Sequence, residues 1–524
     1  MPIYQQVIER IGVRRVVFYK SDYLYTTMGV RALLSRPLAR YIIENQHRWM
    51  AEGPAVQSSW QKKLVGRAAG TQFGKDHFFK DVHSYEDFKQ AVPIRDYEEL
   101  KPYVEHILHG ESDVLWPGKP AYFAKTSGTT SGVKYIPITS ESLPNHINSA
   151  RDALLNYVHE TGKAEFLDKK LIFLSGSPEL TTKAGIHIGR LSGIVNHHVP
   201  AYLRTNQLPS YETNCIEDWE TKLEKIIDET IDQPMSLISG IPPWVQMYFD
   251  RIRARTGQDI KDVFPDFSLF VYGGVNFEPY RAKLFEAIGK RIDSVETYPA
   301  SEGFIAYQDS QIAEGLLLLL DSGIFFEFIP VETYFDEKPK RLSIAEVEVG
   351  KNYAVIINSN AGLWGYSLGD TVKFVSTDPY RIVVTGRIKH FISAFGEHVI
   401  GEEIEKALQY AMQRHPEVEV TECTVAPMVA PPEGGLPYHE WLIEFATPPT
   451  DAEAFALDLD RRLTELNVYY DDLISGSILK PLVITSLPKN AFINYMRSQG
   501  KLGGQNKVPR LSNDRKIADG LKGH

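Results

Sequence analysis

Cysteine is nearly absent from this chain of 524 residues, which contains only Cys215 and Cys423. Two cysteines cannot form a zinc cluster without other ligands, and they do not suggest a disulfide framework. A chain of this length buries a large core and needs neither a disulfide nor a metal for stability. The sequence therefore favours a protein of the reducing cytoplasm.

Long apolar runs are also missing. The most apolar stretch is the five leucines of residues 316–320, which Asp321 follows, whereas a membrane-spanning helix needs about 20 apolar residues. Residues 1–20 include Glu9 and lack the continuous apolar core of a secretory signal. We expect no membrane partner, and an amphipathic helix at 1–20 would pack on its own protein.

Positive charge is in deficit, with 57 Lys and Arg against 67 Asp and Glu and a net charge of −10. This balance argues against nucleic acid as the main partner. Hydrophobic residues at 43% and charged residues at 24% exclude a disordered chain. Residues 497–524 are locally basic, which is typical either of a solvated terminus or of a segment that meets phosphate.

The predicted secondary-structure pattern changes twice along the chain. The first 120 residues or so predict mostly helices. Short β-rich runs separated by helical patterns then predict an α/β architecture with covered sheets. From about residue 386 the pattern is that of a smaller α+β unit, so we predict domains at 1–385 and 386–524. The expected strands are 171–175, 235–240, 269–274, 294–298, 354–358, 381–385, 419–426, 440–446 and 481–485.

Helices are expected where apolar residues recur at every third or fourth position. One such pattern runs from 142 to 158, and another runs from 404 to 412. The residues Thr450 and Glu453 match a capping box that opens a third helix. Residues 428–439 are rich in proline and glycine and predict an exposed loop.

A loop of hydroxyl and glycine residues at 126–132 is the first chemical candidate. It contains Ser127, Gly128, Thr129, Thr130 and Ser131. Glycines allow close backbone approach, and consecutive amide N–H groups with hydroxyl donors can hold an anion. The spacing is not that of a Walker loop. Phosphate binding and an ordinary Ser/Thr-rich surface loop both remain open.

Two further candidates follow predicted strands. Gly273 and Gly274 would let a flat ring lie against the backbone, or they form a plain strand-to-helix turn. The segment 297–303 places Thr297, Tyr298, Ser301 and Glu302 after the next strand. Tyr298 could stack on a base, and Glu302 could bind magnesium beside substrate phosphates; a solvated loop glutamate is the alternative.

The last candidate is the pair Asp370 and Arg387. An aspartate between strands would accept two hydroxyl protons of a ribose, and the arginine would add a polar anchor. An ordinary turn aspartate is the alternative.

The order of these segments resembles the adenylate-forming superfamily, whose members make acyl-AMP from a carboxylate and ATP. Residues 386–408 are similar to its domain-junction motif, in which Lys389 takes the hinge position. The segments Phe-Phe-Glu-Phe-Ile-Pro-Val-Glu at 325–332 and Gly-Gly-Gln-Asn-Lys-Val-Pro-Arg-Leu at 503–511 resemble the Gretchen Hagen family of auxin-responsive acyl acid amido synthetases. The resemblance extends from about residue 30 to residue 511.

This resemblance implies a large N-terminal adenylate-forming domain with several sheets and helices, and a small, mobile α+β C-terminal domain. It implies an ATP- and Mg²⁺-dependent ligase that activates an acyl acid as acyl-AMP and transfers it to an amino acid amine. The alternatives are an acyl-CoA ligase with the same first step and a nucleotide-binding regulatory protein without catalysis. The acyl acid, the amino acid and the oligomeric state stay open.

The resemblance also implies roles for single residues. Ser127, Thr129 and Thr130 would hold phosphates, Gly273, Gly274 and Tyr298 would bracket adenine, Asp370 and Arg387 would fix the ribose, and Glu302 would hold magnesium. A catalytic lysine from the small domain is expected at Lys507, with Lys501 as the alternative. Arg151 could face the acyl carboxylate, and His197 and His198 could line its pocket; surface charge or ordinary packing are the alternatives for these three.

Overall fold

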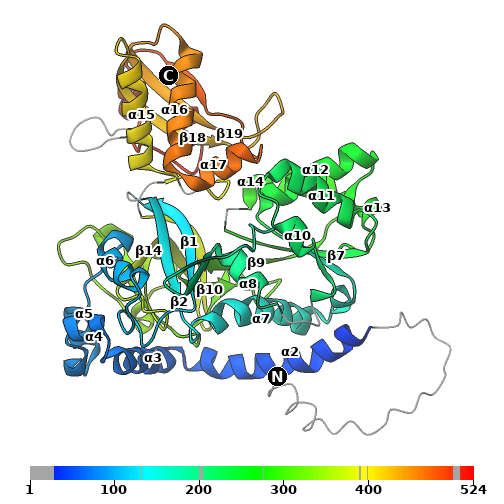
Figure 1. The fold of residues 1–524 in the computed structure, drawn as a ribbon, viewed down its shortest axis with the longest axis vertical. Helices are drawn as coiled ribbons and strands as arrows, with labels where there is room; N and C mark the ends of the chain where they lie inside the picture. Colours follow the sequence, from blue (N-terminus) through cyan, green and yellow to red (C-terminus); the bar gives the residue numbers. More distant parts are fainter. Residues whose placement is uncertain are drawn as a thin grey trace, which may run out of the picture.

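The computed structural model describes residues 29–129, 132–199, 204–274, 277–388, 391–392, 394–397, 399–499 and 508–523. Figure 1 shows a large N-terminal region with a smaller C-terminal domain above it. The long helix α2 (Val30–Ala51) lies along the base of the N-terminal region, at the end opposite the C-terminal domain.

The described chain begins with helices, as the sequence predicts. After α2 come α3 (Gly53–Ala68), α4 (Gln72–Asp76), the 3₁₀ turn η1 (Phe79–Asp81), α5 (Tyr85–Ala91) and α6 (Tyr97–Leu108). Capping boxes open α5 at Ser84 and α6 at Asp96. Each cap satisfies backbone N–H groups that have no partner within the helix, so the sequence fixes where these helices begin.

An eleven-stranded sheet forms the centre of the N-terminal region. Its strand order is β12-β13-β14-β15-β11-β10-β9-β8-β7-β3-β6. The consecutive strands β9, β8, β7, β3 and β6 run parallel to one another, and the other pairs, including β9 with β10, are antiparallel. The bounds are β3 (Lys170–Phe173), β6 (Gln207–Leu208), β7 (Met235–Ser239), β8 (Leu269–Gly273), β9 (Asp293–Ala300), β10 (Gly303–Tyr307), β11 (Leu316–Leu318), β12 (Ile324–Pro330), β13 (Asn352–Ser359), β14 (Tyr366–Thr377) and β15 (Tyr380–Arg387).

Helices cover both faces of the parallel strands. Leu237 of β7 and Leu269 of β8 pack in one cluster with α2 and α7 (Leu143–Thr161), whereas Ile238 and Phe270 pack in another with helices of the opposite face. Successive strand residues point to opposite faces, so continuous apolar runs such as 269–272 are what a doubly covered sheet requires. The helices of the second face are α11 (Trp219–Thr230), α12 (Pro242–Thr256) and α14 (Glu278–Ile288).

A second sheet of four strands holds the hydroxyl-rich segment. Its order is β2-β1-β5-β4, with β1 (Tyr122–Thr129), β2 (Gly132–Ile138), β4 (Thr181–Lys183) and β5 (Ile186–Gly189). The remaining short helices of the N-terminal region are η2 (Glu165–Asp168), α8 (Leu191–Asn196), α10 (Tyr211–Asn214), α13 (Ile260–Val263), η3 (Val331–Thr333) and η4 (Ile344–Glu346).

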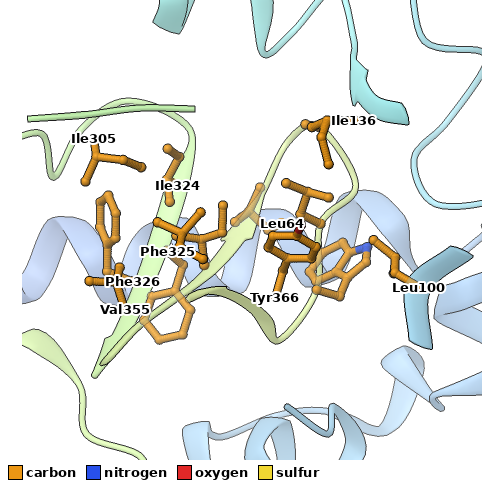
Figure 2. Packing of buried hydrophobic residues seen from close by; sticks show 14 of the residues in the cluster. Leu64, Leu100, Ile136, Ile305, Ile324, Phe325, Phe326, Val355 and Tyr366 are labelled. Atoms are coloured by element: carbon orange, nitrogen blue, oxygen red, sulfur yellow. The ribbon is translucent and has the colours of Figure 1, made fainter. Parts of the chain in front are cut away.

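One buried cluster joins the two sheets to the early helices. Figure 2 shows Leu64 of α3, Leu100 of α6, Ile136 of β2, and Phe325 and Tyr366 of the large sheet among its members. Burial of apolar surface contributes about 25 cal/mol per Å², and each of these side chains is almost fully buried. The hairpin β1–β2 is therefore anchored at its base by the main core.

The C-terminal domain is an α+β unit, in agreement with the sequence. Its sheet has the order β18-β19-β20, and α15 and α16 pack against each other. Its elements are β16 (Phe391–Ile392), β17 (Val399–Ile400), α15 (Gly401–Arg414), β18 (Glu419–Met428), β19 (Tyr438–Thr447), α16 (Ala452–Leu466), α17 (Val468–Ser475), β20 (Val483–Leu487), α18 (Ala491–Ser498) and α19 (Lys516–Lys522).

One detail of the prediction is wrong. The cap of α16 is Asp451, whose carboxylate accepts from the backbone N–H of Ala454, and not Thr450. An aspartate caps as well as a threonine and also favours the positive end of the helix dipole, so the start shifts by one residue. Across the described residues, no helix combines the length and the apolar character needed to span a bilayer.

Candidate active site

The hydroxyl-rich segment forms the tip of the hairpin β1–β2. Ser127, Gly128 and Thr129 are the last residues of β1, and Thr126 pairs with Lys134 of β2. Thr130 and Ser131 lie outside the described residues, as do the side chains from 127 to 132. The segment predicted as a loop is thus mostly strand, because residues 122–126 pair in register with 134–138.

The two glycines at the end of β8 meet the adjacent strand β9 closely. A Cβ on Gly273 would lie 2.3 Å from the carbonyl oxygen of Thr297. The Thr297 hydroxyl donates to the carbonyl oxygen of Tyr272 at 2.9 Å. Gly274 has φ of +81°, a conformation that favours glycine. The Gly-Gly pair therefore permits a close strand contact at Gly273 and a bend of the backbone at Gly274.

Asp370 lies within strand β14, so the expectation of a position between strands is wrong. It pairs across the sheet with Arg387 of β15. Gly369 takes φ of +77°, which lets the strand continue through an irregular pairing instead of ending. The Arg387 guanidinium forms an ion pair with Asp370. The Tyr298 hydroxyl donates to the other oxygen of this carboxylate at 2.5 Å.

Glu302 lies in the two-residue turn, Ser301 and Glu302, that joins β9 to β10. The hydroxyl of Tyr366 donates to Glu302 Oε1 at 3.0 Å. Burial, with Asp370 close by, raises the pKa of Tyr298 well above its usual value, and burial, with Glu302 close by, does the same for Tyr366. Both phenols stay protonated and serve as donors to carboxylates.

The single carboxylate Glu302 is compatible with magnesium that substrate phosphates also coordinate, since Mg²⁺ commonly takes one or two carboxylates together with phosphate oxygens. A metal cage made of protein alone is not available in the described ranges, where no group of three His, Cys, Asp or Glu side chains converges. Tyr366 occupies only one oxygen of Glu302, so the donor set fits the ion.

Lys134 belongs to the site although the sequence reasoning did not select it. Its pKa is lowered by burial, which outweighs the opposite effect of Glu302, and Arg387 and Asp370 also act on it. Its ammonium lies 5.9 Å from the centre of the Tyr97 ring. Its position eight residues after the start of the hydroxyl-rich segment was the sequence feature that could have indicated its role. The lysine brings a positive charge from the hairpin to the carboxylates of the large sheet.

The three residues predicted for the acyl site form contacts with other parts of the protein. Arg151 forms its ion pair with the neighbouring Asp152 on α7. His197 contacts the carbonyl oxygen of Pro178 at 2.7 Å, and His198 contacts the hydroxyl of Tyr122 at 2.9 Å. These contacts fix local loops, and the acyl role of all three remains a prediction.

The Phe-Glu-Phe-Ile-Pro segment is structural. Glu327 is fully buried in β12 and pairs with Arg341 at 2.6 Å. It also accepts from Asn358 and Tyr85. A buried carboxylate with this many partners holds strands together. Lys507, Lys501 and Lys389 lie outside the described residues.

Comparison with solved structures identifies the fold of the chain. The chain superposes on an acyl acid amido synthetase, AtGH3.15 in complex with 2,4-DB, with a TM-score of 0.57 at 15% identity over 93% of this chain and 96% of that one. It superposes on a 2-hydroxyisobutyryl-CoA ligase with a TM-score of 0.56 at 13% identity over 90% and 92%. The chain therefore has the same fold as these two enzymes.

Three sequence matches then identify the family. Residues 42–208 match the GH3 family N-terminal domain, residues 317–387 the central domain and residues 402–516 the C-terminal domain. The chain belongs to the GH3 family, the Gretchen Hagen family of the motifs above. It is 23% identical to the indole-3-acetic acid-amido synthetase GH3.3 of Arabidopsis thaliana over 87% of this chain and 89% of the relative. It is 22% identical to the jasmonoyl–L-amino acid synthetase JAR4 of Nicotiana attenuata over 63% and 68%.

Proposed function

We propose that this protein is an ATP-dependent acid–amino acid ligase. An acyl carboxylate attacks the α-phosphorus of ATP and expels pyrophosphate, and an amine then attacks the acyl carbonyl carbon, expels AMP and loses a proton. The observation that carries the proposal is the convergence of Glu302, Asp370 and Arg387 with Lys134 of the hairpin, in a chain of the GH3 family.

The nucleotide would lie across the ends of β8 and β9 and beside Asp370 within β14. Gly273 and Gly274 offer backbone without side chains to an adenine ring. Asp370 is held by Tyr298 and Arg387, and a carboxylate has about four acceptor sites, so it can still accept ribose hydroxyls. Its two protein partners fix its orientation, which is the pre-organisation that binding requires.

The phosphates would lie at the hairpin, where backbone N–H groups and the hydroxyls of 127–131 supply donors. Lys134 adds positive charge in a half-buried position, where its interaction with phosphate is stronger than in water. Bound magnesium would neutralise charge on the phosphates, and Glu302 is the residue that would hold it. Lys507 from the small domain remains the proposed catalytic lysine at the α-phosphate, and Lys501 its alternative.

The boundary between the two domains is proposed at 385/386, where the junction motif begins, inside the last residues of β15 (Tyr380–Arg387). A cytoplasmic location is proposed as well, and the two free cysteines support it.

The molecule that accepts the acyl group distinguishes the proposed function from its alternatives. Purified protein with ATP, Mg²⁺ and a panel of carboxylic acids should yield acyl hydroxamate when hydroxylamine traps the adenylate. Addition of amino acids should then release AMP and form an amide, whereas coenzyme A should not. Release of AMP with coenzyme A alone would identify an acyl-CoA ligase. Nucleotide binding without hydroxamate from any acid would identify a regulatory protein.

A further inference from the structure

Helix α17 of the C-terminal domain contacts the hairpin that carries the phosphate segment. The hydroxyl of Tyr469 donates to the carbonyl oxygen of Lys125 in β1 at 3.0 Å. Lys125 directly precedes Thr126, where the hydroxyl-rich segment begins. In Figure 1, α17 lies on the side of the C-terminal domain that faces β1. A residue of one domain therefore fixes the backbone of the hairpin in the other.

A second contact lies one turn further along α17. Asp472 forms an ion pair with Arg190, the residue that precedes α8 in the large region. The guanidinium of Arg190 also lies over the Tyr469 ring, 5.3 Å from its centre. Arg190 therefore contacts Tyr469 and Asp472 together. A Cβ on Gly176 would lie 2.8 Å from Arg190 Cδ, so this glycine leaves room for the arginine.

The C-terminal domain holds α17 in a defined orientation. Asn467 is fully buried, and its side chain accepts from the backbone N–H groups of Tyr469 and Tyr470. The Asn467 amide also donates to Glu403 of α15 at 3.0 Å. Tyr469 and Asp472 are thus presented by a capped helix that is tied to the rest of the domain.

These contacts suit an interaction that forms and breaks. The side chains of Arg190 and Asp472 are 33% and 39% exposed, and partly exposed ion pairs contribute little to stability. Burial raises the pKa of Tyr469, so its hydroxyl remains a donor over the physiological range. A domain that rotates between two half-reactions needs contacts that are specific in geometry and weak in energy.

We propose that Tyr469 and Asp472 form an interdomain latch with Lys125 and Arg190, and that the latch positions the phosphate-binding hairpin for adenylation. The proposal rests on the proposed function, because the triphosphate is present only in the first half-reaction. These two residues are positioning residues, since they act through the hairpin. Loss of the latch should therefore raise KM for ATP and slow adenylation, and it should spare amide transfer from preformed acyl-AMP.

The test measures the two half-reactions separately in Tyr469→Phe, Asp472→Asn and Arg190→Gln. Pyrophosphate release at varied ATP reports the first, and AMP release from isolated enzyme–acyl-AMP after addition of an amino acid reports the second. We expect adenylation at limiting ATP to fall about threefold to fivefold in each variant, as for loss of one hydrogen bond or one partly exposed ion pair. The swap Arg190→Asp with Asp472→Arg should recover part of the loss.

The matched control is Asp471→Asn, on the same helix, where the carboxylate accepts a local hydrogen bond from Ser475. It should behave as wild type. Equal losses in both half-reactions, or losses that the charge swap does not relieve, would overturn the latch because they indicate a general structural defect.

A distance measurement that does not depend on catalysis tests the latch independently of the proposed function. Fluorescent labels at Ile312→Cys and Leu457→Cys, both strongly exposed positions, report the distance between the domains in a Cys215→Ser background. Asp472→Asn should broaden the distance distribution, and the charge swap should narrow it again. If wild type releases no pyrophosphate with any acid, the proposed function fails while these distances still decide the contact. An unchanged distribution in Asp472→Asn overturns the latch.

Discussion

For Tyr298, the sequence predicted the segment that belongs to the candidate site but not the partner of the side chain. The spacing of residues 297–303 indicated a ligand site, and a tyrosine there suggested a ring that stacks on a base. In the structure its hydroxyl donates to Asp370, 72 positions away. The hydroxyl of Tyr366 donates to Glu302 in the same way. Residue types and local spacing predicted which segments converge, but pairing between segments depends on strand register, which no local pattern encodes.

The role of Glu302 leads to the first prediction. Glu302→Gln keeps the size of the side chain and removes the charge that would hold magnesium, so adenylation should fall on the order of 10²-fold, as when one stabilising group for developing charge is removed. Steady-state pyrophosphate release over a magnesium titration measures the effect. Glu348→Gln, at an exposed ion pair with Lys351, is the control. Unchanged magnesium dependence in Glu302→Gln would remove this residue from the site.

His146 leads to a prediction about pH. It is buried near the start of α7, and burial lowers its pKa to about 4 from an ordinary value of 6.5. Between these values the unfolded chain binds a proton that the folded protein does not, so stability falls as pH falls. The difference in pKa corresponds to about 3 kcal/mol.

Denaturant unfolding at pH 7 and pH 4 measures this loss. His146→Leu cannot take up the proton and should lose about 3 kcal/mol less than wild type between the two pH values. His159→Gln, at the exposed end of the same helix, should lose as much as wild type. Identical pH dependence in wild type and His146→Leu would contradict the prediction.

At the scale of elements, many strands were predictable from the sequence, whereas the strands of the hairpin β1–β2 were not. Runs such as 235–240 and 269–274 correspond to β7 and β8, because a strand covered on both faces must be apolar throughout. The hairpin β1–β2 was expected as a loop, since serine, threonine and glycine there carry no strand signal. Its pairing comes from residues 122–126 and 134–138 on either side, and the core in Figure 2 holds its base.

The close contact of β8 with β9 gives a prediction about this pair of strands. Gly273→Ala would place a Cβ 2.3 Å from the Thr297 carbonyl oxygen, so the strands must separate. We expect a loss of about 2 kcal/mol or more in the free energy of unfolding. Nucleotide affinity should fall as well, because the proposed nucleotide site lies at the ends of these strands.

Gly66→Ala is the matched control for Gly273→Ala. Gly66 lies within α3, and a Cβ there would meet no atom within 4 Å. Alanine favours the helix over glycine by about 1 kcal/mol, so this variant should be more stable than wild type. Thermal unfolding and equilibrium nucleotide binding, measured on both variants, check the pair. A Gly273→Ala protein as stable as wild type would show that the strand contact can relax.

At the scale of the whole molecule, the junction between the domains is held at points on both sides of Lys389. Ile388 donates its backbone N–H to Gly369 in the large sheet at 2.8 Å. Beyond it, Glu397 is fully buried and contacts His439 of β19 at 2.8 Å. Tyr280 of α14 donates to the carbonyl oxygen of Ala394 at 2.8 Å. A rotation of the small domain must therefore be absorbed between residues 388 and 397, and it must break the contact of Tyr280 with Ala394 if it takes place at Lys389.

The last prediction tests this hinge with Lys389→Pro, at a position outside the described residues. Proline fixes φ near −65° and removes a backbone N–H, and a few backbone dihedrals at a hinge absorb a large domain movement. We expect the variant to slow one half-reaction several-fold more than the other, with ATP binding nearly intact, because the proposed nucleotide site lies on the large sheet. Rapid-quench measurement of adenylate formation and of amide transfer, with ATP affinity by calorimetry, distinguishes the outcomes. Equal losses in both steps, or none, would remove Lys389 from the proposed hinge.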